Sequence, residues 1–224
     1  NKLKYMQLNN DDIVLIDKPR GISSFGVVAK VRYHLSQQLG KKAKVGHTGT
    51  LDPFATGLMI LVTGTMCKRA QEFAKQDKIY QATFVLGKTS STADVEGKLR
   101  QRSRQRPSLA TIQLAMTQLT GVIWQTPPVF SAIKINGQRA YQLARQGRAV
   151  EMPRRQVTIY QLELLDYVYP RLTVRVKVSS GTYIRSLAVD LGRALGVGAY
   201  CQTLRRLAIA DKTVDQALKF NQLA

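Results

Sequence analysis

The stretch RLTVRVKV, residues 171–178, decides the fold class of this chain. Its apolar and polar side chains alternate with a period of two, so one face of an extended strand carries Leu172, Val174, Val176 and Val178. The opposite face carries Arg171, Thr173, Arg175 and Lys177. Alternation of this kind is typical of a strand with one face in the core and the other in water. The sequence therefore predicts a sheet whose outer face is hydrated and basic.

The segments on either side of this strand switch between strand-like and helix-like patterns. Short apolar runs predict strands at 13–17, 58–62, 78–86, 157–168 and, as the last strand, 201–209. Apolar stripes predict helices from Ser23 or Ser24 to Gly40, over 66–76 with Thr65 as the cap, and over 109–119, 140–146 and 184–195. Asn136-Gly137 predicts a hairpin, because this dipeptide accepts positive φ values. Hairpin strands mixed with helices predict an α+β fold with a mixed sheet, in one continuous domain.

The charge of the chain points to a polyanionic partner. The sequence has 34 Lys and Arg against 14 Asp and Glu, a formal net charge of +20, and its 44% of hydrophobic residues are enough for a folded core. Nucleic acid is favoured over a lipid surface, because the basic residues are spread through the apolar pattern and do not follow one amphipathic helix. The longest apolar run, 58–62, is far too short to span a membrane.

Two basic clusters stand out from this background. Lys41, Lys42 and Lys44 follow the predicted helix end at Gly40. The second cluster alternates with small or polar residues before Pro107 and consists of Lys98, Arg100, Arg102, Arg104 and Arg106. Each cluster can be a solvated, mobile loop. For the second, the alternative is an exposed arm that contacts phosphates.

The residue inventory excludes several chemistries. His34 and His47 are the only histidines, and neither Cys-x-x-Cys nor His-Glu-x-x-His occurs, so we expect no metal site. Glycine motifs for nucleotide cofactors are also missing, so we expect no cofactor. The two cysteines, Cys67 and Cys201, lie in apolar stretches and are expected to be buried, reduced thiols in a reducing compartment. Covalent or acid-base catalysis by this chain would therefore depend on a carboxylate.

One carboxylate lies in an unusual setting, the stretch GHTGTLDPFATG at residues 46–57. Three glycines, nearby hydroxyl groups and the proline after Asp52 predict a rigid, irregular loop that holds a side chain open. A positive environment favours the ionised form of Asp52, which suits a nucleophile more than a general acid. The alternatives are that Asp52 is a turn residue before proline and that His47 is a structural histidine.

The stretch GHTGTLDPFATGL, residues 46–58, resembles the catalytic motif of the TruB-type tRNA pseudouridine synthases. Other segments are similar to further motifs of that family: DKPRG at 17–21, KIY at 78–80, the thumb loop at 127–147, SGTYIRSL at 180–187 and LRRL at 204–207. The resemblance covers about residues 13–218. It implies the family's fold, in which a mainly antiparallel central sheet with flanking helices carries a protruding thumb loop, here at 127–148.

The resemblance also implies an activity. Members of the family isomerise uridine to pseudouridine in the T-loop of tRNA, at position 55, after flipping the base out of its stack. Asp52 is implied as the nucleophile or the ribose-activating carboxylate, and Arg185 as its ion-pair partner. Tyr80 is implied to stack on the flipped base and to help remove the C5 proton. Without the resemblance, Arg185 could be a surface arginine and Tyr80 a half-buried strand aromatic.

Further residues are implied to bind the substrate. His47 would fill the space that the flipped base leaves, and Lys18 and Tyr183 would shape the pocket more than they react. Leu204 opens the carboxy-terminal motif. The thumb loop, which resembles the element that closes over the T-arm of tRNA, carries Lys134, Arg139, Arg145 and Arg148.

The resemblance leaves alternatives for the molecule as a whole. Bacterial family members usually continue into a small carboxy-terminal RNA-binding domain, and we expect residues 1–224 to be the catalytic domain without it. A cytoplasmic monomer that acts on the T-arm without a membrane or an obligatory protein partner is the first expectation. The alternatives are a non-catalytic RNA-binding or tRNA-folding protein, and the catalytic subunit of a guide-RNA-dependent particle.

Overall fold

The computed structural model describes residues 8–223 and divides the chain into two compact units. Unit 1 is described over residues 8–80 and 205–223, and unit 2 is Gln81–Leu204. Two strands continue through the boundaries, β4 (Lys78–Leu86) and β12 (Ala199–Ile209). The expectation of one catalytic domain stays a prediction.

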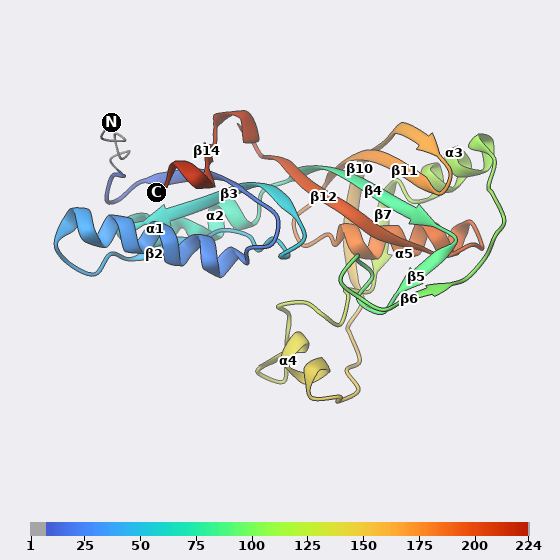
Figure 1. Cartoon of the computed structure of the whole chain (residues 1–224), viewed down its shortest axis with the longest axis horizontal. Coiled ribbons are helices and arrows are strands. Elements are labelled where there is room, and N and C mark those ends of the chain that lie inside the picture. Colours follow the sequence, from blue (N-terminus) through green and yellow to red (C-terminus); the bar gives the residue numbers. More distant parts are fainter. Residues whose placement is uncertain (1–7, 224) are drawn as a thin grey trace. The chain divides into compact units, whose positions relative to one another are not determined.

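Unit 1 is built on a sheet with the strand order β14-β1-β3-β12 (Figure 1). Its strands are β1 (Ile13–Lys18), β2 (Val45–His47), β3 (Thr56–Thr63), the second part of β12, β13 (Lys212–Thr213) and β14 (Leu218–Lys219). β1 and β2 run antiparallel to β3, whereas β12 pairs with β3 in parallel. Leu58, Ile60, Ile209 and Val214 form a core cluster. The two short strands after β12 correct the prediction that β12 is the last strand, because two residues are too few for a periodic pattern.

The first helix of unit 1 follows the sequence prediction closely. α1 (Ser24–Leu39) starts after Ser23, whose side chain accepts a hydrogen bond from the Gly26 N–H, and ends at Gly40 with a φ of 64°. Such a left-handed residue is a common end of a helix and suits glycine. The apolar stripe on which this prediction rests consists of Val27, Val28, Val31, Leu35 and Leu39, and the first four are buried while Leu39 is half-buried.

The second helical segment of unit 1 differs from the prediction. A 3-10 helix, η1 (Gly64–Arg69), precedes a five-residue α-helix, α2 (Ala70–Ala74), so the single helix over 66–76 capped by Thr65 was wrong. The Asp11 carboxylate accepts a hydrogen bond from the Thr65 N–H. The group that satisfies this first turn therefore comes from a distant part of the sequence, which a local pattern cannot reveal. In η1 Cys67 is half-buried, not buried as expected, whereas Cys201 of β12 is buried.

Unit 2 is built on a sheet with the strand order β12-β4-β11-β10-β7. β7 (Gly121–Gln125) and β11 (Arg171–Val178) both pair antiparallel with the long β10 (Arg155–Val168). The alternation in β11 is confirmed, because its four apolar side chains are buried and its cations are exposed. A separate hairpin joins β5 (Lys88–Ser90) to β6 (Leu99–Gln101). The predicted α+β class with a mixed, mainly antiparallel sheet is confirmed.

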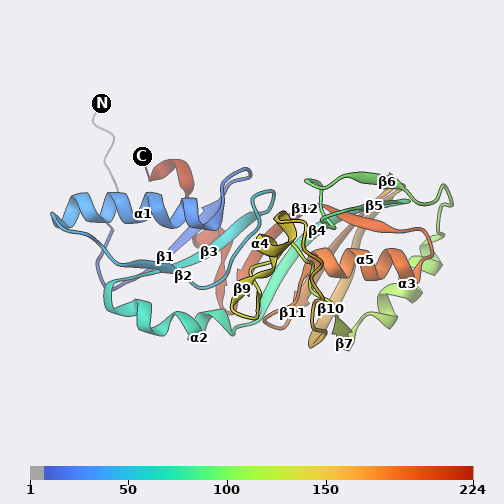
Figure 2. The same cartoon turned by 90° about the horizontal axis from the view of Figure 1, so that it is seen from below.

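Three helices complete the described part of unit 2. α3 (Leu109–Gln118) is capped by Ser108, and α5 (Ile184–Ala194) ends before Gly196, which has a φ of 69°. α4 (Ala140–Arg145) belongs to the thumb loop, together with the hairpin strands β8 (Lys134–Ile135) and β9 (Gln138–Arg139). Figure 1 shows this loop below the strands of unit 2, and Figure 2, seen from below, shows it in front of them. No helix described between residues 8 and 223 is long and apolar enough to cross a membrane.

Candidate active site

The Asp52 loop, residues 46–58, is held in place through its backbone carbonyls. Alternate carbonyls, those of Gly49, Leu51 and Pro53, each accept a hydrogen bond from another part of unit 1. The carbonyl of Asp52 itself accepts a bond from the Ala55 N–H at 3.1 Å, which closes the turn after the aspartate. The polar backbone of this irregular stretch is thus satisfied on both sides of Asp52.

Two of the donors to these carbonyls are buried side chains from distant elements. The Arg206 guanidinium, only 1% exposed, donates to the Gly49 carbonyl at 3.1 Å and to the Leu58 carbonyl at 2.7 Å. The Ser24 hydroxyl, at the start of α1, donates to the Leu51 carbonyl at 2.9 Å and accepts from the Leu51 N–H at 2.8 Å. Neither side chain can be assigned this role from the sequence, because only the fold brings β12 and α1 to the loop.

The side chains of the loop divide between the core and the surface. Leu51, Phe54 and Ala55 are at most 4% exposed, so they fix the loop from the inside. Between them Asp52 is half-buried and Pro53 is exposed. The loop therefore presents the carboxylate at the edge of a rigid core, which is the preorganisation that a catalytic group needs.

Lys18 also helps to fix this loop. It is fully buried at the end of β1, and its ammonium donates to the carbonyls of Pro19, Ile22 and Pro53 at 2.8 to 3.3 Å. The Gly21 N–H donates to the same Pro53 carbonyl at 2.8 Å. These contacts hold the backbone next to Asp52, and the expected roles of Lys18, shaping the pocket and contacting substrate, stay predictions.

Tyr80 and His47 also lie in unit 1. Tyr80 is 7% exposed on β4, two residues after the buried Lys78. Burial, with a smaller contribution from the positive charge of Arg206, lowers the pKa of Lys78 to about 8. His47 is half-buried at the end of β2, opposite Leu61 of β3. The roles expected for Tyr80 and His47 around the flipped base stay predictions.

Arg185 is the centre of a polar cluster in unit 2. It is 3% exposed, so the alternative of a surface arginine was wrong. One guanidinium nitrogen donates to the Thr92 carbonyl at 3.0 Å and to the Asp94 carboxylate at 3.1 Å, and the other donates to the Phe130 carbonyl at 2.8 Å. Arg185 therefore ties α5 to the loop between β5 and β6 and to the root of the thumb loop.

Asp94 is a residue of this cluster that the sequence does not reveal. It is 2% exposed, and it accepts hydrogen bonds from the Thr92 hydroxyl at 2.5 Å and from the Glu96 N–H at 3.0 Å. Its ion pair with Arg185 joins residues 91 positions apart, so no local pattern signals it. Asp52 belongs to unit 1 and Arg185 to unit 2, and their expected ion pair stays a prediction.

The remaining expected substrate-binding residues lie on three elements of unit 2. Tyr183 precedes α5, and its backbone is tied to the Gln125 side chain by hydrogen bonds of 2.7 and 3.0 Å. Leu204 is 7% exposed on β12. Lys134 is exposed on β8 in the thumb loop. Their contacts with a substrate stay predictions.

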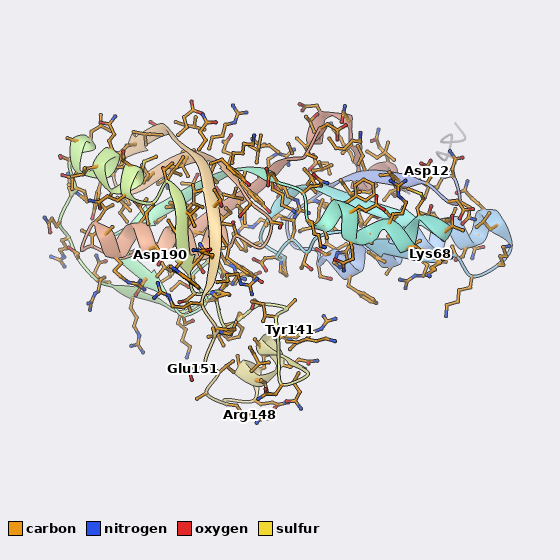
Figure 3. The ribbon with its side chains drawn as sticks, turned by 180° about the vertical axis from the view of Figure 1, so that it is seen from behind. Asp12, Lys68, Tyr141, Arg148, Glu151 and Asp190 are labelled. Atoms are coloured by element: carbon orange, nitrogen blue, oxygen red, sulfur yellow. The ribbon has the colours of Figure 1, made fainter. Side chains whose placement is uncertain are left out.

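The thumb loop has the turn that its sequence predicts. Asn136 and Gly137 have φ values of 48° and 82° and connect β8 to β9, as expected for an Asn-Gly hairpin. Figure 3 labels Tyr141 and Arg148 on this loop, and Glu151 on the segment that follows it. The four cations of the loop, Lys134, Arg139, Arg145 and Arg148, are all exposed.

Comparison with known proteins gives the class to which this fold and loop belong, the pseudouridine synthases. The model of the TruB family pseudouridylate synthase, N-terminal domain, matches residues 37–184, a range that includes the Asp52 loop and Tyr80. The chain belongs to the TruB family of pseudouridylate synthases, as its motifs predict.

Curated relatives and a solved structure extend this finding over most of the chain. It is 42% identical over 215 residues to tRNA pseudouridine synthase B of Phocaeicola vulgatus, covering 95% of this chain and 92% of the relative. It is 44% identical over 209 residues to tRNA pseudouridine synthase B of Parabacteroides distasonis, covering 92% and 89%. A chain in the crystal structure of a Cbf5-Nop10-Gar1 complex matches 95% of this chain, with a TM-score of 0.70 and 26% identity, and the match covers 53% of that longer chain.

Proposed function

We propose that this chain isomerises uridine to pseudouridine in the T-loop of tRNA, at position 55. The observation that carries the proposal is the Asp52 loop, in which a half-buried carboxylate is presented by a backbone fixed at Gly49, Leu51 and Pro53. Family membership and relatives named tRNA pseudouridine synthase B support tRNA as the substrate.

The reaction is an isomerisation, so its atoms balance within the substrate. The C–N bond between ribose and base breaks, a C–C bond forms to C5 of the same base, C5 loses its proton and N1 gains one. A carboxylate can assist as a nucleophile towards the base or the sugar, or by helping the base to leave as an anion. Asp52 takes this role, and the fixed loop holds it in a reactive orientation before the substrate arrives.

The target base must leave its stack before it can react. Flipping a base costs a few kcal/mol, which contacts to the phosphates and stacking in the pocket must offset. The net charge of +20 and the exposed cations of the thumb loop favour the phosphate contacts, and Tyr80 supplies an aromatic ring for stacking. The T-arm is then recognised mainly by its folded shape.

Arg185 acts in this proposal as the partner that orients Asp52. A guanidinium can orient a carboxylate only if it is itself fixed, and Arg185 is fixed by Asp94, Thr92 and Phe130. Asp94 is then a positioning residue that acts through Arg185. The enzyme is proposed to act as a cytoplasmic monomer.

The test is a map of pseudouridine in tRNA made with the wild type and with variants. The protein is incubated alone with an unmodified tRNA transcript, and pseudouridine is mapped for the wild type, Asp52→Asn and the control Asp215→Asn, which changes an exposed carboxylate in η2 (Val214–Gln216). We expect product at position 55 with the wild type and the control, and a loss of at least about 1,000-fold with Asp52→Asn although the variant still binds tRNA.

Other outcomes would contradict the proposal. If Asp52→Asn forms product at the wild-type rate, Asp52 does not have the proposed catalytic role. If no product appears while wild type and Asp52→Ala improve tRNA folding equally, the chain is an RNA-folding protein. If product appears only after a guide RNA is added, the chain is a guide-dependent subunit.

A further inference from the structure

A basic arm, residues 98–106, lies in unit 2 outside the residues assigned to the reaction. Its cations are all exposed: Lys98, Arg100, Arg102, Arg104 and Arg106. The arm includes β6 and ends before Pro107, which is buried. The sequence left open whether this segment is a mobile loop or a site for phosphates.

Hydrogen bonds fix the backbone of the arm in its middle and directly after its last residue. The Gly87 carbonyl accepts bonds from the N–H groups of Arg102 and Ser103 at 2.8 and 3.1 Å. Directly after the arm, the Tyr167 hydroxyl donates to the Pro107 carbonyl at 2.8 Å. The arm is therefore a fixed segment that presents its cations, which lowers the entropy cost of binding a ligand there.

The charge of the arm is not balanced by neighbouring carboxylates. In the part of the chain that the structure describes, Lys98, Arg100, Arg102 and Arg104 form no ion pair. Residues 87–107 contain only two acids, Asp94 and Glu96. Asp94 is buried and pairs with Arg185, so it does not compensate the surface cations. Glu96 is exposed and sets one negative charge against the five cations of the arm.

The spacing of the cations suits a chain of phosphates. Residues two apart on a strand are separated by about 6.6 Å. β6 and the residues that flank it therefore space Lys98, Arg100 and Arg102 at regular intervals along one extended segment. A polymer with one negative charge per repeat can contact several of them at once.

The arm is also connected to the parts of unit 2 that are proposed to contact RNA. Arg185 binds the loop between β5 and β6 through Thr92 and Asp94, and it binds the root of the thumb loop through Phe130. Figure 1 shows the β5–β6 hairpin at the lower edge of unit 2, the edge from which the thumb loop projects. An RNA held by the thumb loop thus has the hairpin on the same side of the unit.

We propose that the basic arm is a second docking site for RNA, which binds the phosphodiester backbone without reading its sequence. RNA is favoured over a lipid surface because membrane binding needs an apolar face, whereas Leu99 is the only apolar side chain among residues 98–106. The inference rests on the proposed function only in naming RNA as the partner. Its contribution is affinity, not chemistry.

The test compares two triple variants that remove equal charge from unit 2. Arg100→Gln, Arg102→Gln and Arg104→Gln are combined in the arm variant. Arg171→Gln, Arg175→Gln and Lys177→Gln are combined in the control, because these exposed cations also lie two or four residues apart on an extended strand. Each variant lowers the net charge from +20 to +17, so the overall field of the protein changes equally.

Binding of a labelled tRNA transcript is measured by fluorescence anisotropy between 50 and 200 mM KCl. Each lost phosphate contact lowers the magnitude of the log–log salt slope by about 0.9, so the arm variant should lose about 2 to 3 and the control less than about 1. At the lowest salt the arm variant should bind at least about 10-fold more weakly than the control. Replacing the same three arginines by lysine should keep most of the slope, because the charge is retained.

Three results would overturn the proposal. One is equal affinity and equal salt slope for the arm variant and the control. A second is that replacing the same three arginines by lysine weakens RNA binding as much as replacing them by glutamine. This result would indicate a structural defect, because lysine retains the charge. Thermal unfolding of all variants checks for such a defect. A third is that the arm variant binds RNA as the wild type does but no longer binds vesicles of anionic lipid. Product formation by the wild type is followed separately, and its absence would contradict the proposed function but leave the binding comparison valid.

Discussion

Two neighbouring arginines of β12 act in different environments. Arg205 pairs with Asp17 through two hydrogen bonds of 2.8 and 3.0 Å, and both side chains are partly exposed. Arg206 is buried and donates to the backbone of the Asp52 loop. Successive residues of a strand point to opposite sides, so one position stabilises the surface and the next one the interior.

This difference predicts unequal effects of the same substitution. Arg206→Lys should lower the free energy of unfolding by about 2 to 4 kcal/mol, because one ammonium cannot replace the fork that reaches both carbonyls and a buried acceptor is left unsatisfied. Arg205→Lys, the matched control, should cost about 1 kcal/mol or less, since its ion pair is partly exposed.

Denaturant unfolding of both variants measures these values. Equal losses for the two positions would contradict the role of Arg206. Steady-state kinetics should also show a lower kcat for Arg206→Lys, because the Gly49 carbonyl that it holds lies in the same loop as Asp52.

Lys78 predicts a dependence of stability on pH. Its pKa is lowered from 10.5 to about 8, mainly by burial and further by Arg206. Between these two values the folded chain carries a neutral Lys78 while the unfolded chain still binds the proton, so this group makes stability rise with pH. Below about pH 8 the lysine is protonated in both states, and its contribution no longer changes.

A difference measurement isolates this group from the other titrating residues. The free energy of unfolding of the wild type minus that of Lys78→Met should increase from about pH 8 to about pH 10, by at most about 3 kcal/mol. It should be flat between about pH 6 and about pH 7.5. A difference that falls as the pH rises above this range would contradict the lowered pKa.

At the scale of elements, the parallel pairing of β3 with β12 depends on one glycine. Gly57 has a φ of 105° and lies opposite Arg206. A Cβ at this position would lie 2.2 Å from the Arg206 carbonyl oxygen, which is backbone and cannot move aside cheaply. The last glycine of the catalytic motif is therefore required by the sheet that carries the loop.

Gly57→Ala should destabilise the protein by about 3 kcal/mol or more, because strain at positive φ adds to this clash. Gly46→Ala in the same motif is the control, since the nearest atom to its Cβ would be 3.7 Å away in ordinary contact. Its cost should stay below about 1 kcal/mol. Thermal unfolding of the two variants tests this prediction. Similar melting temperatures would contradict the close approach of Gly57 to the backbone of Arg206.

The elements that the sequence predicted well are those in which a pattern repeats several times. α1 and β11 repeat their pattern over 16 and 8 residues, and both were predicted with their buried faces. η1 is a 3-10 helix of 6 residues, β13 and β14 have 2 residues each, and their formation depends on partners elsewhere in the chain. Local pattern therefore decides long elements, and tertiary contacts decide short ones.

At the scale of the molecule, the charge of +20 predicts how RNA binding responds to salt. Every phosphate that the protein neutralises releases counterions, so the logarithm of the association constant should fall with the logarithm of the salt concentration by about 0.9 per contact. With about six or more contacts, affinity for tRNA should drop by at least about 1,000-fold between 50 and 200 mM KCl.

Anisotropy titrations of wild-type protein at a series of salt concentrations test this expectation. A slope of the log–log plot smaller in magnitude than about 2 would mean that most of the positive charge does not contact phosphates. Titrations of heparin, a polyanion without bases, serve as a control for purely electrostatic binding.

The candidate site could be predicted from the sequence only where a local motif marks it. The stretch 46–58 marked Asp52, because its glycines, its proline and its acid are adjacent in the chain. The groups that fix the loop could not be found in this way. Ser24 acts across 27 positions, Arg206 across 157 and Asp94, in the other cluster, across 91.

The sequence by itself determined the family, the α+β class, the place of Asp52 in its motif and the basic character of the surface. Each of these follows from residues adjacent in the chain or from the composition. Only the tertiary structure decided which buried side chains fix that aspartate's loop and which acid holds Arg185. The physical reason is that hydrogen bonds and ion pairs depend on distance in space, and folding brings together residues whose separation along the chain carries no signal.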